Sequence, residues 1–249
     1  MALVRETTGI DDAWPVTCEP FIQWVIEDDF PLGRPPLEEV GVQLVDDVVP
    51  YELMKLRLLN ASHQSLAHWG RLLGYTFAHE AASDPDIEHF TREFLTREAL
   101  TTLPEVPGID VTNYIDILFE RFTNSAIADT LARLAFDASD RMPKFVIPTA
   151  IDRAHAGDSS PLAAGMCAAW ALGMEGSMVQ LDIQDSHWPT LKKLVSHDGG
   201  GNAEGLLSDV AVLGPLTENN HFRQDYCAAL GLIRTQGARA AIKALSAFA

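Results

Sequence analysis

Apolar residues recur with a helical period along most of the chain, and the most regular stretch begins at Val49. From Val49 to His63 the only helix-breaking residue is Pro50, which stands in the first turn, and the pattern continues to Gly74. Proline in the first turn and glycine after the last turn are the usual limits of a helix. The pattern therefore predicts a helix of roughly six turns over residues 49–74.

Four polar side chains share one arc of this predicted helix with apolar residues. At roughly 100° per residue, with Lys55 at zero, Glu52 falls near 60°, His63 near 80° and Asn60 near 140°. The apolar residues in the same arc are Leu56, Leu59, Leu66 and Ala67. Unpaired polar groups on a packing face cost several kcal/mol, so such groups line a cleft or bond to neighbouring loops. The helical period alone leaves both interpretations open.

Two short segments before this helix are rich in β-branched residues. They are residues 23–27 and 41–45, each bounded by proline, glycine or aspartate. Such boundaries predict two strands, which we expect to pair around the loop 30–36. Residues 1–20 are expected to be irregular, because two X-Pro pairs interrupt any helix there.

The rest of the chain has a predominantly helical pattern. Asp110 is a predicted N-cap, and Pro161 follows two serines at a predicted helix start. Small residues between 161 and 174 allow neighbouring helices to approach closely, so this helix should lie inside. The predicted helices are 86–102, 111–121, 125–138, 149–155 (after a connection bracketed by Pro143 and Pro148), 161–174, 203–210 and 222–248, with a flexible loop at 196–202. Together these elements predict one mainly α domain with a minor β element.

The composition is strongly acidic. Lys and Arg number 18 against 35 Asp and Glu, which gives a net charge of −17. Such a surface repels nucleic-acid phosphates and anionic lipid, so neither nucleic acid nor a membrane is an expected partner. No apolar run approaches the roughly 18 residues that span a bilayer, and the first residues lack the apolar segment of a signal peptide. Cys18, Cys167 and Cys227 are widely spaced, which indicates reduced thiols in a cytoplasmic protein.

The motifs of several common enzyme classes are missing. No strand–GxGxxG–helix unit for a dinucleotide and no Walker A sequence occurs, and the glycines at 199–201 have the wrong spacing. His79 begins a zinc-protease pattern, but Ser83 stands where the second histidine is needed. His63 and His68 are five residues apart and face different sides of a helix. Since there is also no GxSxG turn, we expect neither a metal site nor an acyl-transfer site.

Three blocks of sequence are distinctive. The first comprises EPFIQWVIED (19–28), GRP (33–35), GVQ (41–43) and YELMKLRLLNASH (51–63); the second comprises RFTN (121–124) and RLAFDASDRMPKF (133–145); the third is DVAVLGPL (209–216). Together they closely resemble the mannitol dehydrogenase family, the long-chain polyol-specific dehydrogenases, which includes mannitol 2-dehydrogenase, arabinitol dehydrogenase and the uronate reductases. The resemblance covers nearly the whole chain.

The resemblance implies a two-domain parent architecture of which this sequence is one part. The family has an N-terminal Rossmann domain for the nicotinamide cofactor and a helical C-terminal substrate domain, similar to the C-terminal domain of 6-phosphogluconate dehydrogenase. This sequence resembles the second domain alone, with 1–20 as an interdomain segment and 21–249 as the substrate domain. The cofactor, NAD or NADP, would be bound mainly by the Rossmann domain, which is missing here.

The resemblance also assigns roles on the predicted helix. Lys55 stands at the position of the family's general base, which takes the proton of the alcohol as hydride leaves carbon. Partial burial among neighbouring leucines would favour loss of the lysine proton near neutral pH. Asn60 matches the amide that stabilises the developing oxygen charge, His63 the histidine that positions substrate, and Glu52 the carboxylate that exchanges protons with solvent. A simpler interpretation of Glu52 is an acid that complements the helix dipole.

Two arginines complete the implied site, and they rest on the resemblance alone. Arg133 fits an arginine that bonds substrate hydroxyls, and a surface ion pair is its alternative interpretation. Arg141 stands where the family has a lysine, and this change keeps the charge but alters reach and geometry.

The implied function is that of the catalytic half of a metal-independent polyol or sugar oxidoreductase, with mannitol and fructose as the closest substrate pair. The partners would be the small polyol or ketose and a complementary Rossmann domain. The alternative is a truncated or split-gene product without activity of its own, which acts as a binding or assembly module for a separate Rossmann chain.

Overall fold

The computed structural model describes residues 2–16, 18–19, 21–196 and 199–248. Its contacts divide the chain into two compact units, Met1–Val48 and Val49–Ala249. The boundary predicted near residue 20 stays a prediction. Part of the loop predicted to be flexible, residues 197 and 198, lies outside the described residues.

The first unit contains a short helix and a small sheet. Its elements are α1 (Ala2–Thr8), β1 (Val25–Glu27), a 3₁₀-helix (Leu37–Val40) and β2 (Gln43–Val45). The prediction that residues 1–20 are irregular is wrong for α1, because the X-Pro pairs lie beyond this helix. The predicted pairing of the two strands is confirmed. The strands are parallel, with Val25 opposite Gln43. The long connection between them therefore returns the chain to the end of the sheet at which β1 begins.

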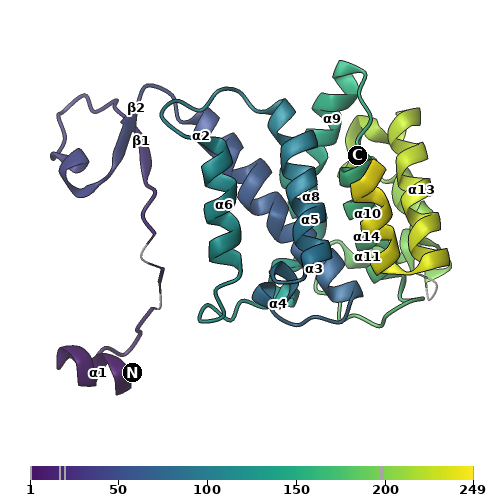
Figure 1. The fold of residues 1–249 in the computed structure, drawn as a ribbon, viewed down its shortest axis with the longest axis horizontal. Coiled ribbons are helices and arrows are strands. Elements are labelled where there is room, and N and C mark those ends of the chain that lie inside the picture. Colours follow the sequence, from purple (N-terminus) through teal and green to yellow (C-terminus); the bar gives the residue numbers. More distant parts are fainter. Residues whose placement is uncertain (1, 17, 20, 197–198, 249) are drawn as a thin grey trace. The chain divides into compact units, whose positions relative to one another are not determined.

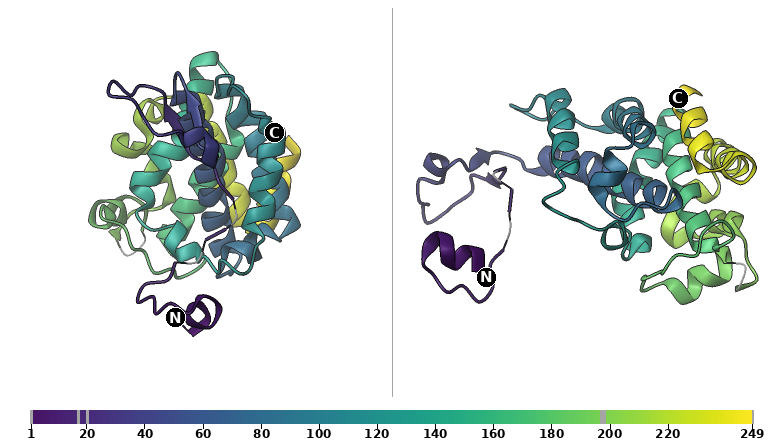
Figure 2. Two further views of the ribbon diagram at one scale, coloured as in Figure 1. Left: turned by 90° about the vertical axis from the view of Figure 1, so that its left-hand side faces the viewer. Right: turned by 60° about the horizontal axis from the view of Figure 1, so that its bottom comes forward.

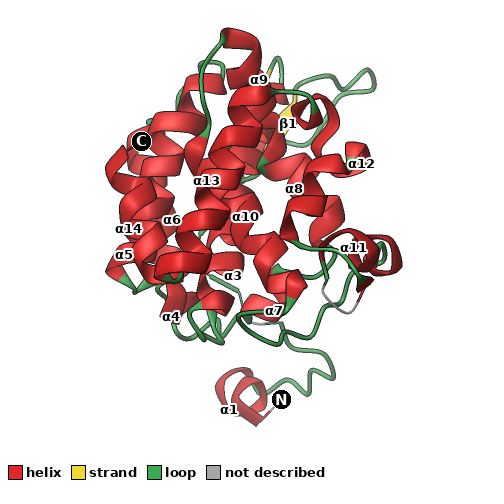
Figure 3. Cartoon of the chain, turned by 90° about the vertical axis from the view of Figure 1, so that its right-hand side faces the viewer, coloured by secondary structure: helices red, strands yellow, loops and turns green. Residues whose placement is uncertain are grey.

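The second unit is a helical bundle (Figures 1 and 3). Its elements are α2 (Val49–Met54), a π-helix (Lys55–Asn60), α3 (Ala61–Leu72), α4 (Ala78–Ala82), α5 (Pro85–Glu93), a second π-helix (Phe94–Ala99), a 3₁₀-helix (Leu100–Thr102), α6 (Val111–Phe122), α7 (Leu131–Leu134), α8 (Ala138–Phe145), α9 (Ile147–Ala156), α10 (Pro161–Glu175), α11 (Trp188–Val195), a 3₁₀-helix (Ala203–Ser208), α12 (Val210–Leu213), a 3₁₀-helix (Gly214–Thr217), α13 (Asn220–Gln236) and α14 (Ala238–Phe248). The predicted fold class, mainly α with a minor two-stranded element, is confirmed.

Helix α10 forms the centre of the bundle, as its small residues predicted. It contacts α3, α9, α11, α13 and α14, and every residue from Leu162 to Glu175 is buried. A Cβ added to Gly165 would stand 2.8 Å from Leu245 Cδ1, so the glycine lets α14 approach α10 closely. This close approach packs the last helix of the bundle, α14, directly against the central helix.

Several helix boundaries follow the predicted local signals. Asp110 accepts a hydrogen bond from the backbone N–H of Asn113 at 3.1 Å and caps α6. The helix predicted over 49–74 spans Val49–Leu72, as the continuous helical run in Figure 2 shows, although its middle is a π-helix. The helix predicted over 86–102 exists, with a π-helix and a 3₁₀-helix as its second half.

The prediction of one helix over residues 125–138 is wrong. Within this range only α7, four residues long, and Ala138, the first residue of α8, are helical. Thr130 caps α7 by accepting from the N–H of Arg133 at 3.2 Å. Ala128 and Asp137 have positive φ values of 49° and 48°, which no right-handed helix accommodates. A tertiary contact stabilises the second of these, since the N–H of Asp137 donates to the carbonyl of Gln184 at 3.0 Å.

Three other boundaries also differ from prediction. Pro143 and Pro148 do not bracket a connection: Pro143 lies inside α8, and Pro148 lies in the first turn of α9, where proline is tolerated. Residues 222–248 form two helices, α13 and α14, because Gly237 has φ +84°. Residues 203–210 form a 3₁₀-helix that ends at Ser208. Within the described residues, no helix combines the length and apolar character that crossing a bilayer requires.

Candidate active site

The π-helix Lys55–Asn60 changes which residues align along the central helical run. A π-helix bonds residue i to i+5, so Asn60 lies nearly above Lys55, and not roughly 140° away as on an α-helical wheel. Glu52 precedes Lys55 by three residues and His63 follows Asn60 by three, which is the spacing of neighbours on one helical face. The wider turn of the π-helix therefore aligns Glu52, Lys55, Asn60 and His63 in a single row along the helical run.

This row lies beside the packing face of the run, and not within it as the wheel predicted. The fully buried residues are Met54, Leu58, Ala61, Ser62, Ser65, Leu66, Ala67 and Trp69. Glu52 and Lys55 are exposed, and Asn60 and His63 are half-buried. The expected partial burial of Lys55 is therefore absent in this chain. The predicted position of the four polar residues was wrong because it assumed a uniform α-helical period, which the π-helix interrupts.

His63 stands where the row meets the neighbouring helices. Its ring lies 5.0 Å from the ring of Phe122, at the end of α6. Burial of the imidazole lowers the pKa of His63 to about 4, so the side chain is neutral at physiological pH. The charged groups that act on it are Asp129, which raises this pKa, and Arg133, Arg121 and Arg141, which lower it. Two predicted substrate residues, Arg133 and Arg141, are thus electrostatic neighbours of His63.

The two arginines make different contacts. Arg133 is exposed and forms a two-point ion pair with Asp129, in which Nε donates to Oδ1 at 2.5 Å and Nη2 donates to Oδ2. Arg141 lies on α8, and its Nη1 donates to the backbone carbonyls of Arg133 at 3.1 Å and Leu134 at 2.9 Å. Arg141 therefore satisfies the last carbonyls of α7 and links α7 to α8.

Sequence reasoning missed Asp129 and Arg121 in this environment. The spacing of Asp129 and Arg133 is the i,i+4 spacing of helical ion pairs and was a usable signal. Gln64 was also missed: it is 1% exposed, and its Nε2 donates to the carbonyl of Leu134 at 3.1 Å, the same carbonyl that Arg141 contacts. No periodic pattern distinguishes it from other buried residues of α3.

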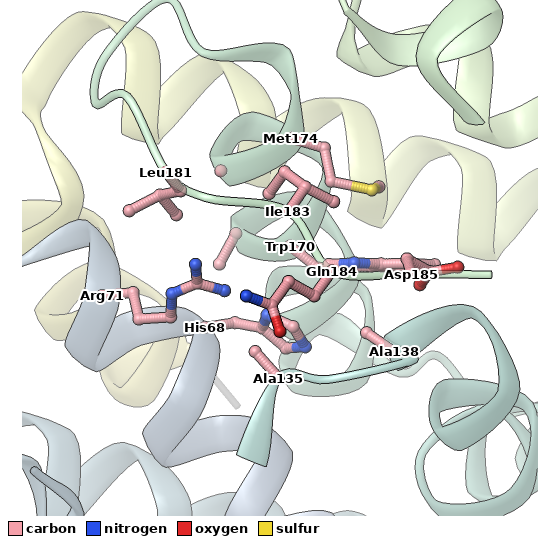
Figure 4. A pocket seen from close by; sticks show the side chains of 12 residues that line it. His68, Arg71, Ala135, Ala138, Trp170, Met174, Leu181, Ile183, Gln184 and Asp185 are labelled. Atoms are coloured by element: carbon pink, nitrogen blue, oxygen red, sulfur yellow. The ribbon is translucent and has the colours of Figure 1, made fainter. Parts of the chain in front are cut away.

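A small pocket elsewhere in the bundle is lined mainly by apolar residues, with a few polar side chains among them. It has a volume of about 20 Å³, and the side chains of His68, Arg71 and Gln184 converge on it beside Trp170 (Figure 4). Burial lowers the pKa of His68 to about 3. None of the six predicted site residues lines this pocket, so the row on the π-helix is a separate feature. Among the described residues, no three His, Cys, Asp or Glu side chains gather as a set of metal ligands.

Comparison with known proteins shows where this arrangement belongs. Residues 47–233 match the family described as the mannitol dehydrogenase C-terminal domain. This chain belongs to the mannitol dehydrogenase family. The match begins next to α2 and includes the π-helix, α7 and α8, so all six predicted site residues lie within it.

Individual relatives agree with this assignment. Mannitol dehydrogenase 2 of Saccharomyces cerevisiae is 40% identical over 96% of this chain and 49% of its own length. Mannitol 2-dehydrogenase of Aspergillus niger is 36% identical over 94% of this chain and 49% of its own length. The chain thus spans about half the length of the curated relatives that it matches.

Two solved structures share the fold. Mannitol 2-dehydrogenase of Pseudomonas fluorescens, in a ternary complex with NAD and D-mannitol, superposes with a TM-score of 0.87 at 40% identity, covering 98% of this chain and 50% of that one. A D-sorbitol dehydrogenase in substrate-free form gives a TM-score of 0.83 at 29% identity, covering 97% of this chain and 50% of that one.

Proposed function

We propose that this chain is the substrate-binding and catalytic half of a metal-independent NAD- or NADP-linked oxidoreductase that interconverts a polyol and its ketose. D-Mannitol and fructose are the proposed pair. The observation that carries the proposal is the single row of Glu52, Lys55, Asn60 and His63, which depends on the π-helix. Proton-transferring and oxygen-binding groups must lie within reach of the same carbon, and a row on one helical face satisfies that requirement.

The residues of the row divide the proton and oxygen chemistry. Lys55, in its neutral form, takes the hydroxyl proton of the alcohol. The side-chain N–H of Asn60 donates to the same oxygen as its charge develops. His63 is uncharged at neutral pH, so it orients a substrate hydroxyl through a neutral hydrogen bond. Glu52 is exposed and lies one turn before Lys55, where it passes the proton on to solvent.

The arginines bind the remaining hydroxyls of the substrate. Arg133 uses two of its five N–H groups on Asp129, and the other three have no partner among the described residues. These donors suit the hydroxyl groups of an open-chain polyol. Arg141 contributes chiefly by joining α7 to α8, which keeps Arg133 beside the row.

The cofactor is the oxidant of the proposed reaction, and NAD when bound supplies the hydride acceptor. Within the described residues there is no strand–glycine turn–helix unit of the kind that holds a pyrophosphate, and the two strands form a separate small sheet. The groups that hold the dinucleotide phosphates are therefore assigned to another domain. Covering of the exposed Lys55 by that domain would supply the desolvation that this chain lacks.

The test is oxidation of D-mannitol with NAD at alkaline pH, followed by the absorbance of reduced cofactor. The chain is assayed alone and with the N-terminal half of a family member added. Lys55→Ala should abolish turnover while the helical circular dichroism is kept, and Lys144→Ala, at an exposed lysine on α8, should leave turnover unchanged. Turnover retained by Lys55→Ala would refute the role of Lys55. A natural chain silent in both assays would favour the assembly module without activity of its own.

A further inference from the structure

The backbone around Asp129 is fixed from both sides. The carbonyl of Asp129 accepts from the N–H of Ala78 at 2.8 Å, and the N–H of Leu131 donates to the carbonyl of Thr76 at 2.9 Å. Phe77 and Thr130 form an antiparallel bridge between these two bonds. The segment before α7 is therefore held against the start of α4, which determines where the Asp129 carboxylate lies.

The Asp129 side chain is the sheltered member of its ion pair. Its side chain is 17% exposed, whereas that of Arg133 is 62% exposed. Both carboxylate oxygens of Asp129 bond to the Nε edge of the guanidinium, a two-point geometry that fixes the plane of the group. The Nη1 edge then faces away from Asp129, with its donors available to a ligand.

The same carboxylate acts on His63. Its charge opposes those of Arg133, Arg121 and Arg141 at the imidazole. Burial, the largest single effect, raises the pKa of Asp129, but the hydrogen bond and charge of Arg133, with a smaller effect of His63, bring this pKa below its usual value. One side chain thus connects an arginine and the histidine of the row.

An ordinary surface ion pair of the same spacing is present nearby for comparison. Asp140 and Lys144 on α8 are also four residues apart, with their charged atoms 2.7 Å apart, but both side chains are more than half exposed. Such pairs contribute little beyond local helix stability. Asp129 differs from Asp140 in its burial, in its two-point contact and in the effect of its charge on His63.

We propose that Asp129 is a positioning residue of the candidate active site, which fixes the guanidinium of Arg133 and places it beside His63 so that its free edge meets the substrate hydroxyls. The substrate part of this inference rests on the proposed function. The fixed guanidinium and the electrostatic link to His63 are properties of the chain without substrate.

The experiment is nuclear magnetic resonance on the full chain without ligands. Nitrogen-15 relaxation of the Arg133 Nε–Hε group reports how firmly the guanidinium is held, and the carbon-bound ring protons of His63 report its titration. Asp129→Asn keeps the shape but removes the charge, and Asp129→Glu keeps the charge. Asp140→Asn is the matched control, and circular dichroism checks the fold of each variant.

In Asp129→Asn we expect Arg133 Nε–Hε to become mobile and His63 to protonate at lower pH, since the group that raises its pKa is lost. Asp129→Glu should restore the titration of His63 toward the natural one, and Asp140→Asn should change neither signal. A rigid Arg133 with unchanged His63 titration in Asp129→Asn would overturn the inference, as would equal effects of Asp140→Asn.

The enzymatic readout separates this inference from the proposed function. In the assembled enzyme, Asp129→Asn should raise KM for the polyol about tenfold, equivalent to about 1.4 kcal/mol, with little change in kcat. Loss of kcat with KM unchanged would overturn the positioning role. Absence of turnover in the natural protein would instead refute the proposed function, while the resonance experiment would still decide whether Asp129 fixes Arg133.

Discussion

Glu98 offers a quantitative test of how burial and charge are balanced in the core. Its side chain is 2% exposed at the end of the second π-helix. The carboxylate accepts from the backbone N–H groups of Leu162 at 2.7 Å and Ala163 at 2.9 Å, and so caps α10 from a distant part of the sequence. The perturbation is Glu98→Gln, which keeps the size and one acceptor oxygen but cannot ionise.

The magnitude follows from the pKa of Glu98. Burial raises this pKa from 4.5 to about 7, against the opposing effects of the two N–H donors and of Arg153, and Asp225 raises it further. The folded chain therefore binds this proton more tightly than the unfolded chain does. The contribution of the Glu98 carboxyl group to the free energy of unfolding is fully present below pH 4.5 and is lost as pH rises through about 7. At about 1.4 kcal/mol per pKa unit, the loss is about 3 kcal/mol.

The assay is urea unfolding, followed by circular dichroism at a series of pH values across this interval. Glu98→Gln carries a constant cost for its lost hydrogen bond, so the informative quantity is the pH dependence of its difference from the natural chain. Relative to the natural chain, the variant should gain about 3 kcal/mol as pH rises from 4.5 to above 7. His63 and His68 also titrate, but both are present in each protein and cancel in the difference.

Glu120→Gln, at an exposed glutamate on α6, is the control and should show no such trend. A difference between Glu98→Gln and the natural chain that stays constant with pH would refute the reasoning. It would mean that the two N–H donors of α10 fully offset the desolvation of the carboxylate.

Two further predictions concern packing and a buried ion pair. Gly165→Ala should destabilise the fold by about 1 kcal/mol in urea unfolding, because the clash with Leu245 outweighs the better helix propensity of alanine. Gly231→Ala has open space around the added methyl group and should stabilise the fold by about 0.5 kcal/mol. A change of stability with the same sign in both variants would contradict this. Arg239→Ala should cost about 2 kcal/mol at neutral pH, because it removes the charged partner of Asp84, whose side chain is 3% exposed. Burial raises the pKa of Asp84, but hydrogen bonds led by Arg239 lower it to about 2. The stability lost in Arg239→Ala should therefore shrink as pH falls from 3.8 toward that value. A loss of stability that is independent of pH would contradict the reasoning.

Local signals in the sequence were sufficient to predict the helices whose capping residues and composition lie within the helix itself. Asp110 caps α6 through a bond to a residue three positions away, so the sequence contains both partners within one turn. The small residues of α10 likewise predicted an inner helix, since they allow neighbouring helices to approach closely. The length of the helical run that begins at Val49 was also predictable, from Pro50 in its first turn and Gly74 after its end.

The residues of the candidate site could be named from the sequence and stay predictions, whereas their geometry could not be read from it. The sequence contained Glu52, Lys55, Asn60 and His63 on one predicted helix, and the family resemblance added the arginines. The exposure of Lys55 depended on which neighbours cover it, and no periodic pattern contains that information. The spacing of Asp129 and Arg133 could have indicated their ion pair, but only the folded chain shows that the charge of Asp129 acts on His63, which is far away in sequence.

The sequence by itself determined the mainly helical fold, the inner position of α10 and the identity of the family, because these follow from composition, local capping and contiguous motifs. Only the tertiary structure decided the π-helical step between Lys55 and Asn60, the short α7 and the contacts of Asp129. The end of α7 and the place of Asp129 involve bonds between distant segments, such as the one from Asp137 to Gln184. Backbone conformations that are locally unfavourable persist only where such contacts outweigh their cost, and a local pattern does not reveal them.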